Sequence, residues 1–368
     1  MILPRRPLIL LVIALLVAPI AAMPFVAYRP ASLQENRMLA KPPIWPGTLE
    51  DWRRLPRAID AYLADHFAFR EQAIWAGMRV ERRLGVKARA QALAVMGEGG
   101  QMFLSEGLLR STGQDVDAAR AADYADFVCQ VGARLRAGGV KVATSLAPSP
   151  AGVLTDLAPA WAGPARRPTD YDLILKDLAG CGVPAVDLRP TLIAAARDSK
   201  VYRRFDSHWT SLGALLAYNR MVAALERPDW TVAPESLTWI QQRVEDGDLP
   251  RMAGMAPAVE TIEIHERSGL PPGLVRIPLE GVEAPIKPFE VITGHPGPTV
   301  LVIGDSFTAD LYPPLLAPFA GRIAWIHVDG CLFDWKIVAA VKPDYVMIVP
   351  AERNALCNGQ RPRDLPKS

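Results

Sequence analysis

A short segment near the C-terminal third of the chain carries a serine that could act as a nucleophile. Ser306 follows the apolar run TVLVI and lies within Gly304-Asp305-Ser306-Phe307. The β-prone run predicts a buried strand, which places Ser306 at the carboxyl end of that strand, where α/β sheets form their sites. A serine at a strand-to-helix turn presents its hydroxyl and its N–H together, which suits a nucleophile that also stabilises an oxyanion. The same position also suits an ordinary helix N-cap.

A second segment supplies a base and an acid that could activate this serine. Asp206 and His208 lie two residues apart in FDSHWT. A serine hydroxyl is a weak nucleophile until a base takes its proton, and histidine is the usual base near neutral pH. Side chains two residues apart in an extended loop share one side, so the carboxylate can reach Nδ1 of the imidazole. The alternative is a loop aspartate that caps the following helix. We expect no metal, because the other four histidines show no metal-ligand spacing.

Together the two segments resemble the alginate O-acetyltransferases of the AlgJ/AlgX type, which carry an SGNH-hydrolase-like domain. FDSHWTSLGALLAYN is similar to their Asp-x-His-Trp-x-x-x-Gly motif, and VLVIGDSFT is similar to their Gly-x-Ser-Phe segment. As in that family, the Asp-x-His motif precedes the serine. Further similar segments follow in order: ADHFAFRE (64–71), VMGEGGQMFLSEG (95–107), VDLRPTL (186–192), GDLPRM (247–252) and ERN (352–354). The resemblance implies a catalytic triad of Ser306, His208 and Asp206. No cofactor is expected, because the sequence shows no acetyl-CoA pocket and acetyl-CoA is not expected outside the cytoplasm.

Three further residues are expected near the substrate. The N–H groups of Ser306 and Gly330 are expected to hold the oxyanion. Arg353 follows the last predicted strand and is expected either to contact an acetyl or sugar oxygen or to form a salt bridge with a neighbour. Trp209 could stack on a sugar, although a buried tryptophan usually belongs to the core. The loop PSPAGVL (148–154) lacks a lysine that the family usually shows, so the sequence does not predict the acceptor.

The elements that must position these residues alternate between strands and helices from about residue 115 onward. This order predicts an α/β fold with a parallel sheet flanked by helices, and the resemblance makes it SGNH-hydrolase-like. We expect an extended arm with helices over 29–94 and the acetyltransferase domain over 95–358. Residues 229–297 interrupt the alternation with prolines and short alternating stretches, and they predict an insertion of loops and small strands.

The N-terminal segment predicts a membrane anchor. Residues 8–28 carry no charge and follow Arg5 and Arg6. At about 1.5 Å per residue this length matches the hydrocarbon core of a bilayer. We favour an uncleaved signal anchor over a cleaved signal peptide for residues 1–28, because no clean Ala-x-Ala site is present. The arginines would remain cytoplasmic, so the body is expected outside the inner membrane, in the periplasm of a Gram-negative host.

Composition limits the partners. The 368 residues include 41 basic and 39 acidic ones, so no strongly basic face for nucleic acid is expected. Four cysteines without CxxC spacing argue against a zinc ribbon. An oxidising compartment would permit the disulfides Cys129–Cys181 and Cys331–Cys357, one of three possible connectivities.

The leading functional hypothesis is an O-acetyltransferase that acts on an exopolysaccharide, alginate or another acetylated glycan, through an acetyl-serine intermediate. The resemblance implies a multipass membrane O-acyltransferase as the acetyl supplier. Two alternatives remain open. The same triad would serve an acetylesterase with water as acceptor, and a non-catalytic scaffold or glycan-binding subunit would need no triad.

Overall fold

The computed structural model describes residues 17–357 except 20, 26, 30, 33–36, 41, 44, 84–92, 283, 285, 329, 330 and 332. The chain divides into two compact units, and each is described by itself. The smaller unit comprises Met1–Ala92 and Arg251–Ala256, and the larger comprises Leu93–Pro250 and Pro257–Ser368.

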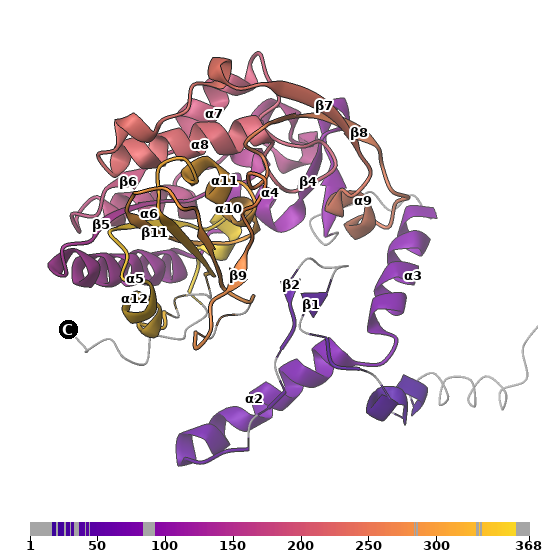
Figure 1. Cartoon of the computed structure of the whole chain (residues 1–368). Coiled ribbons are helices and arrows are strands. Elements are labelled where there is room, and N and C mark those ends of the chain that lie inside the picture. The colour runs from indigo at the N-terminus through magenta and orange to yellow at the C-terminus, as the bar shows by residue number, and fades with distance from the viewer. Residues whose placement is uncertain are drawn as a thin grey trace, which may run out of the picture. The chain divides into compact units, whose positions relative to one another are not determined.

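The larger unit is built on a seven-stranded sheet with the order β6-β5-β13-β11-β12-β10-β9 (Figure 1). The first five strands are parallel, whereas β10 is antiparallel to β12 and β9 is antiparallel to β10. The strands are β5 (Lys141–Ser145), β6 (Ala185–Val186), β9 (Ile277–Pro278), β10 (Phe289–Ile292), β11 (Thr299–Gly304), β12 (Arg322–His327) and β13 (Tyr345–Val349). The predicted α/β fold with a mostly parallel sheet is therefore confirmed.

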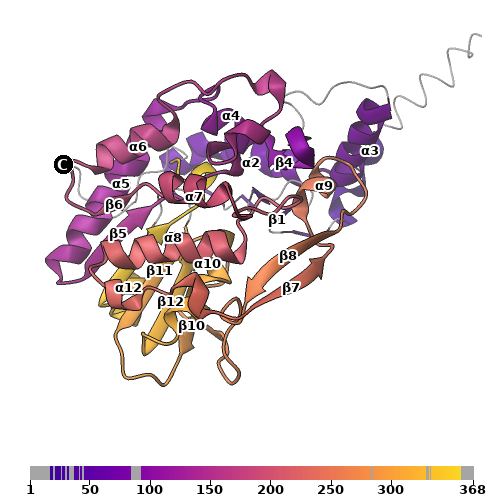
Figure 2. The ribbon, with the colours of Figure 1, turned by 90° about the horizontal axis from the view of Figure 1, so that it is seen from above.

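Helices cover both faces of this sheet (Figures 1 and 2). Leu301 and Ile303 of β11 join one apolar cluster with α5, α6 and α12, while Val300 and Val302 join another with α7, α8 and α11. Because both faces are buried, the central strands read as continuous apolar runs rather than as alternating ones. The helices of this unit are α4 (Ser105–Ser111), α5 (Ala118–Ala137), α6 (Asp170–Leu178), α7 (Arg189–Ala196), α8 (Ser211–Ala224), α9 (Asp248–Met252, which runs into the smaller unit), α10 (Ser306–Ala309), α11 (Tyr312–Leu316) and α12 (Lys336–Val341).

Local sequence signals define where the long helices begin. The side chain of Asp117 accepts a hydrogen bond from the N–H of Arg120 and caps α5. Thr169 and Asp172 form a reciprocal capping box at the start of α6. These short-range contacts explain why the helices could be predicted from the sequence alone.

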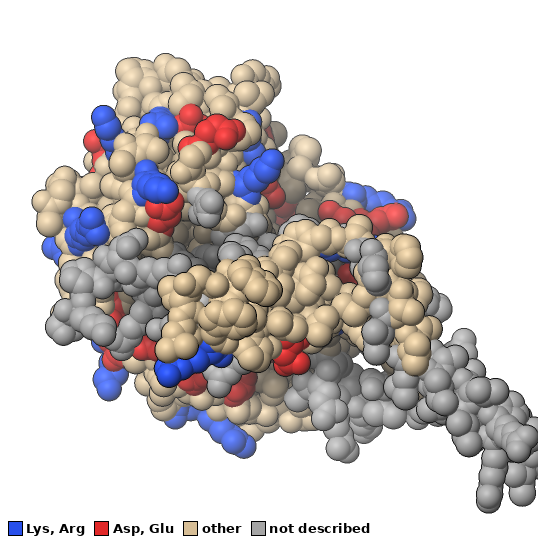
Figure 3. Space-filling model, turned by 90° about the horizontal axis from the view of Figure 1, so that it is seen from below, with Lys and Arg blue, Asp and Glu red and all other residues tan. Residues whose placement is uncertain are grey.

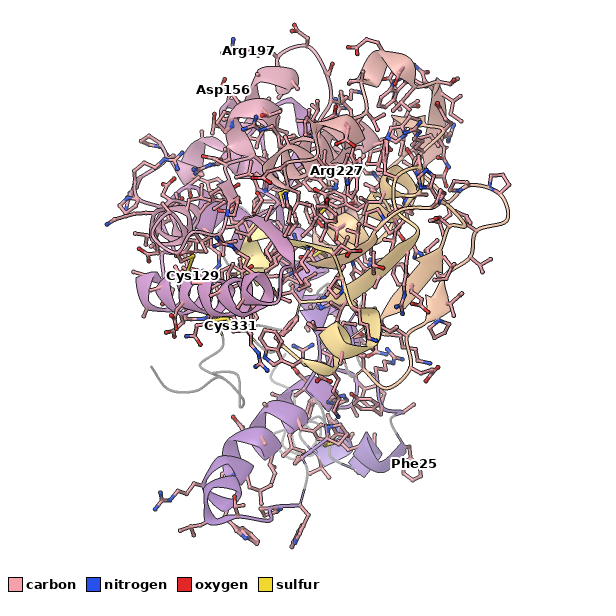
Figure 4. All side chains as sticks on the ribbon, turned by 60° about the vertical axis from the view of Figure 1, so that its left-hand side comes forward. Phe25, Cys129, Asp156, Arg197, Arg227 and Cys331 are labelled. Carbon is pink, nitrogen blue, oxygen red and sulfur yellow. A yellow bond between two sulfur atoms is a disulfide. The ribbon has the colours of Figure 1, made fainter. Side chains whose placement is uncertain are left out.

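Both expected disulfides are present. Cys129 of α5 is bonded to Cys181 beyond the end of α6, with Cα atoms 5.5 Å apart. Cys331, which follows β12, is bonded to Cys357, with Cα atoms 5.3 Å apart. Figure 4 labels one cysteine of each pair. Both bonds lie within the larger unit and connect segments around the cluster that contains α5.

The predicted insertion over 229–297 contributes more to the fold than loops. It contains an antiparallel hairpin of β7 (Trp239–Val244) and β8 (Glu260–His265). It also supplies β9 and β10, which extend the central sheet, with Phe289 of β10 opposite Trp325 of β12. The sequence did not predict this extension, because the pairing depends on contacts with a distant strand. A second antiparallel hairpin pairs β3 (Ala94–Met96) with β4 (Met102–Leu104).

The smaller unit contains two helices, α2 (Leu49–His66) and α3 (Arg70–Arg83), and a short pairing of β1 (Ala31–Ser32) with β2 (Arg37–Met38). The imidazole of His66 stacks against the rings of Tyr28 and Tyr62. The predicted anchor over residues 8–28 lies largely outside the described residues. Among the residues that the structure describes, no helix is both long and apolar enough to cross a membrane.

The charges of the described side chains are mixed in sign on the face that Figure 3 shows. Basic and acidic residues lie there in small neighbouring groups rather than in one extended patch. Ion pairs such as Lys141–Glu226 and Arg227–Asp229 bring opposite charges together in the larger unit.

Candidate active site

The exposed serine lies at the carboxyl edge of the central sheet. Ser306 is the first residue of α10 and follows β11, which is flanked by β13 and β12. Since α10 begins at Ser306, the N–H of this residue has no acceptor within its own helix. The hydroxyl and a free first-turn N–H therefore come from one residue, as the sequence predicts.

Asp305 holds the turn that presents Ser306. Its Oδ1 accepts a hydrogen bond of 3.0 Å from the N–H of Phe307. Its Oδ2 accepts hydrogen bonds of 2.7 Å from the N–H of Ala351 and from Nδ2 of Asn354. The side chain is almost fully buried. Asp305 therefore ties the serine turn to the segment after β13 and does not contact the imidazole.

Asp206, His208 and Ser306 form one continuous chain of contacts. The His208 Nε2 lies 2.8 Å from the Ser306 Oγ, and the His208 Nδ1 lies 2.6 Å from the Asp206 Oδ1. An ionised Asp206 can only accept, so Nδ1 carries the proton and Nε2 is left to accept the serine proton. The structure thus brings together three residues that the sequence separates by as many as 100 positions.

The loop that carries Asp206 and His208 is closed at its base. Tyr202 and Trp209 form an isolated antiparallel bridge, and the N–H of Arg203 donates to the carbonyl oxygen of His208 over 3.1 Å. Within the loop, Ser207 donates to Asp248 through both its N–H and its hydroxyl, at 2.8 Å and 2.7 Å. These contacts fix the backbone on which the acid and the base are mounted.

The loop keeps Asp206 ionised. Burial by itself would raise the pKa of Asp206, but the hydrogen bond and charge of His208 and the nearby charge of Arg203 outweigh it and lower the pKa to about 2. Asp206 therefore remains a carboxylate throughout the neutral range. An ionised partner stabilises the imidazolium that forms when His208 takes a proton.

Of the two alternatives for Trp209, a sugar-stacking face or a core residue, the structure favours the core. Only 2% of Trp209 is exposed, and its Nε1 donates to the carbonyl oxygen of Phe307 over 2.9 Å. Its ring also contacts the rings of Phe307 and Tyr312. Trp209 belongs to the core and connects the His208 loop to the helix that begins at Ser306.

The other two expected site residues are Gly330 and Arg353. Gly330 lies outside the described residues. Arg353 is half-buried, and its guanidinium carbon lies 5.4 Å from the centre of the Phe307 ring. Among the described residues, no hydrogen bond or salt bridge of Arg353 is present, and both alternatives for this residue stay predictions.

One group of side chains in the described region is close enough together to suggest a metal. Oxygen or nitrogen atoms of Asp206, His208 and Asp248 lie within 4.8 Å of one another. The same groups, however, are engaged by the contacts with Ser306 and Ser207 described above. The geometry therefore favours a hydrogen-bonded triad over a metal centre.

Comparison with known proteins assigns this chain to a family. The sequence model of the protein family described as "SGNH hydrolase-like domain, acetyltransferase AlgX" matches residues 94–319, more than half of the chain. The chain belongs to this family. The family is one of SGNH-like O-acetyltransferases, as the sequence resemblance implies. No curated protein matches the chain.

Three solved structures are similar to this chain at low sequence identity, and the similarity to PatB1 supports the α/β fold. PatB1 of Bacillus cereus, with a sulfonyl adduct, is 14% identical, with a TM-score of 0.53, and the match covers 72% of this chain and 97% of PatB1. The O-acetyltransferase domain of Pseudomonas putida AlgJ is 18% identical, with a TM-score of 0.45, covering 71% and 91% of the two chains. Pseudomonas aeruginosa AlgX is 18% identical, with a TM-score of 0.43, covering 73% and 62%.

Several residues that support the site in this AlgX-family domain were not assigned a role from the sequence. Arg203, Asp248 and Asn354 each contact a residue of the proposed triad or its immediate neighbour. The segment GDLPRM was noted for its resemblance only, and Asp248 lies within it. Gly247 offers a physical signal, since a Cβ there would lie 2.2 Å from the carbonyl oxygen of Phe205. Only a glycine permits this close approach to the loop that carries Asp206 and His208.

Proposed function

We propose that this AlgX-family protein transfers acetyl groups to hydroxyls of an exopolysaccharide through an acetyl-serine intermediate on Ser306. The observation that carries the proposal is the unbroken contact from Asp206 through His208 to the exposed Ser306 hydroxyl. Family membership supports acetyl transfer as the reaction.

The reaction would proceed in two steps, acetylation of Ser306 and transfer of the acetyl group to a sugar. The Ser306 Oγ attacks the acetyl carbonyl carbon of a donor while His208 Nε2 takes the serine proton, and the same proton then leaves with the donor's departing oxygen. In the second step a sugar hydroxyl loses its proton to His208 and attacks the acetyl carbon. The Ser306 oxygen leaves and recovers that proton. The N–H of Ser306 would stabilise both oxyanions, and Gly330 remains the proposed second donor.

The acceptor would lie along the loop that carries the acid and base. A cleft of about 360 Å³ borders this loop and is lined by Tyr202, Arg204 and Phe205, among others. Arg353 and His208 both lie near the ring of Phe307. No residue of the proposed triad is among the lining residues of this cleft, so a polymer bound there would extend beyond it to present one hydroxyl to Ser306. Alginate and other acetylated glycans are both consistent with this arrangement.

We place the protein at the inner membrane, with its catalytic body in the periplasm. The uncharged segment 8–28 supports a signal anchor, and the two disulfides support an oxidising compartment. The acetyl donor would then be supplied across the membrane by a multipass O-acyltransferase. This assignment predicts that the two proteins act as a membrane complex.

The proposal predicts an acetyl-enzyme that depends on the triad. We would incubate the full-length protein with p-nitrophenyl acetate and measure by intact mass the gain of one acetyl group. Ser306→Ala is expected to abolish the adduct, and Asp206→Asn to slow it by about a thousandfold or more, because His208 then adopts the wrong tautomer. Arg243→Gln, at an exposed position on β7, serves as the matched control.

The outcomes separate the three functions. Transfer from the acetyl-enzyme to an added glycan supports the transferase, whereas release to water at the same rate with and without glycan supports an acetylesterase. Absence of the adduct in the wild type, together with unchanged polymer acetylation by Ser306→Ala in cells, would support the scaffold.

A further inference from the structure

The guanidinium of Arg203 contacts three carboxylates, one of which belongs to Asp206 of the proposed triad. Its Nη1 lies 3.2 Å from the Asp206 Oδ2, its Nη2 lies 2.8 Å from the Asp246 Oδ1, and its Nε lies 3.2 Å from the Glu260 Oε1. The side chain is only 14% exposed. Every nitrogen of the guanidinium therefore faces a different acidic side chain.

The two oxygens of Asp206 have separate partners. Oδ1 accepts from both the N–H and the Nδ1 of His208, at 2.9 Å and 2.6 Å, whereas Oδ2 faces Arg203. A carboxylate held at both oxygens cannot rotate without breaking one contact. The contact with Arg203 thus fixes the orientation that His208 requires.

Arg203 is itself held in place from two elements. Glu260 on β8 also accepts from the N–H of Arg204 over 2.9 Å, which attaches the β7–β8 hairpin to the loop. The carbonyl oxygen of Arg203 accepts from Nε2 of Gln101 over 2.9 Å, next to β4. These contacts involve the insertion and the N-terminal hairpin, neither of which contributes a member of the triad.

We infer that Arg203 is a positioning residue for the proposed acetyl transfer. Its guanidinium, held in place by Asp246 and Glu260, orients the Asp206 carboxylate toward His208. The inference rests on the proposed function for its catalytic consequence. Its structural consequence, the strength of the Asp206–His208 hydrogen bond, can be measured without any activity.

The decisive measurement is the NMR resonance of the His208 Nδ1 proton, recorded at low temperature and assigned with His208→Ala. A strong hydrogen bond to a carboxylate moves such a proton downfield. In Arg203→Met we expect the resonance to move upfield or to broaden, because Asp206 loses the partner of its second oxygen. Arg243→Met, which removes an exposed arginine paired with Glu245 on the same hairpin, is expected to leave the resonance unchanged.

The pH dependence of this resonance gives a second, independent readout. The charged groups around Asp206 are Arg203, His208 and Asp248, with Asp246 and Glu260 beyond the guanidinium. Removing the neighbouring cation is expected to raise the pKa of Asp206, because the charge of Arg203 favours the ionised carboxylate. As the pH falls, the Asp206–His208 pairing should therefore be lost at a higher pH in Arg203→Met than in the wild type.

Charge and geometry can be separated by Arg203→Lys. A lysine retains the positive charge but cannot face three carboxylates with a planar fork. In Arg203→Lys we expect the Asp206–His208 pairing to be lost on acidification at about the same pH as in the wild type. Acetyl-enzyme formation is still expected to be slower than in the wild type at every pH. For Arg203→Met we expect a slowing of about ten- to hundredfold, the usual cost of removing a partner that orients an active-site side chain.

The results distinguish failure of this inference from failure of the proposed function. If the folded Arg203→Met protein keeps the wild-type resonance and its pH dependence, the positioning role is overturned. If the wild type forms no acetyl-enzyme but the resonance changes as expected, the positioning role stands and the proposed function fails. If Arg203→Met does not fold, Asp246→Asn is the alternative variant, because it removes an ion-pair partner of Arg203 whose side chain is 76% exposed. We expect it to move the His208 Nδ1 proton resonance upfield or to broaden it, as Arg203→Met would.

Discussion

At the scale of the residue, the serine turn depends on a buried carboxylate that takes no part in proton transfer. Asp305 accepts three hydrogen bonds and donates none, and two of the three donors follow β13. The adjacent Ser306 is exposed and faces His208. Neighbouring residues in one motif thus have separate tasks, one structural and one proposed to be catalytic.

Replacement of Asp305 by asparagine tests this division. The amide NH₂ would meet at least one of the three donors, so a buried donor would lose its acceptor. We expect Asp305→Asn to lower the free energy of unfolding by about 1–3 kcal/mol and to slow acetyl-enzyme formation. Urea unfolding and the intact-mass assay measure the two effects. Unchanged stability would mean that the turn does not depend on this carboxylate.

At the scale of the element, the junction of β11 and α10 depends on close contact between backbone and side chain. A Cβ on Gly304 would lie 2.2 Å from the Thr308 Oγ1 and 3.0 Å from the carbonyl oxygen of Val349. The Thr308 hydroxyl in turn accepts from Nε1 of Trp325 over 3.0 Å. The first turn of α10 can therefore approach the strand only because residue 304 has no side chain.

The close contacts at this junction predict that a methyl group added at residue 304 would lower both stability and activity. Gly304→Ala should force Thr308 and the start of α10 away from β11, at a cost of about 1–3 kcal/mol, and should displace the Ser306 hydroxyl from His208. Thermal unfolding and acetyl-enzyme formation would both show the change. Gly269→Ala is the matched control, because a Cβ there meets nothing within 4 Å. Equal effects of the two substitutions would contradict the argument.

At the scale of the whole molecule, the two disulfides constrain loops of different length within the larger unit. Cys129 and Cys181 are 52 residues apart, and Cys331 and Cys357 are 26 apart. The second pair closes the segment between β12 and the region next to Arg353. Both bonds therefore restrict the unfolded chain around the parallel sheet.

Loop length predicts the relative contribution of the two bonds. In the chain-entropy account each disulfide contributes about 2–4 kcal/mol, and doubling the loop adds about 0.6 kcal/mol. Changing Cys129 and Cys181 together to serine should therefore destabilise the protein slightly more than changing Cys331 and Cys357. Urea unfolding of the two double variants measures this difference. A clearly larger loss from the shorter loop would show that native-state contacts, not chain entropy, decide the effect.

The sequence by itself determined what short-range patterns encode. Apolar runs such as TVLVI identified the buried strands, and the two-residue spacing of Asp206 and His208 indicated that acid and base could pair. The alternation of strands and helices was also readable, since helix starts depend on contacts as local as the caps at Asp117 and Thr169, which join residues three apart. The resemblance added the order of the motifs and the family, which the match over residues 94–319 confirms.

Only the tertiary structure decided which distant groups meet. The burial of Trp209, the attachment of Asp305 to Asn354 and the pairing of β10 with β12 all join segments far apart in the chain. Periodicity shows which face of an element is apolar, but it does not show which other element covers that face. The convergence of Asp206, Asp246 and Glu260 on Arg203 likewise depends on how the β7–β8 hairpin packs against the loop.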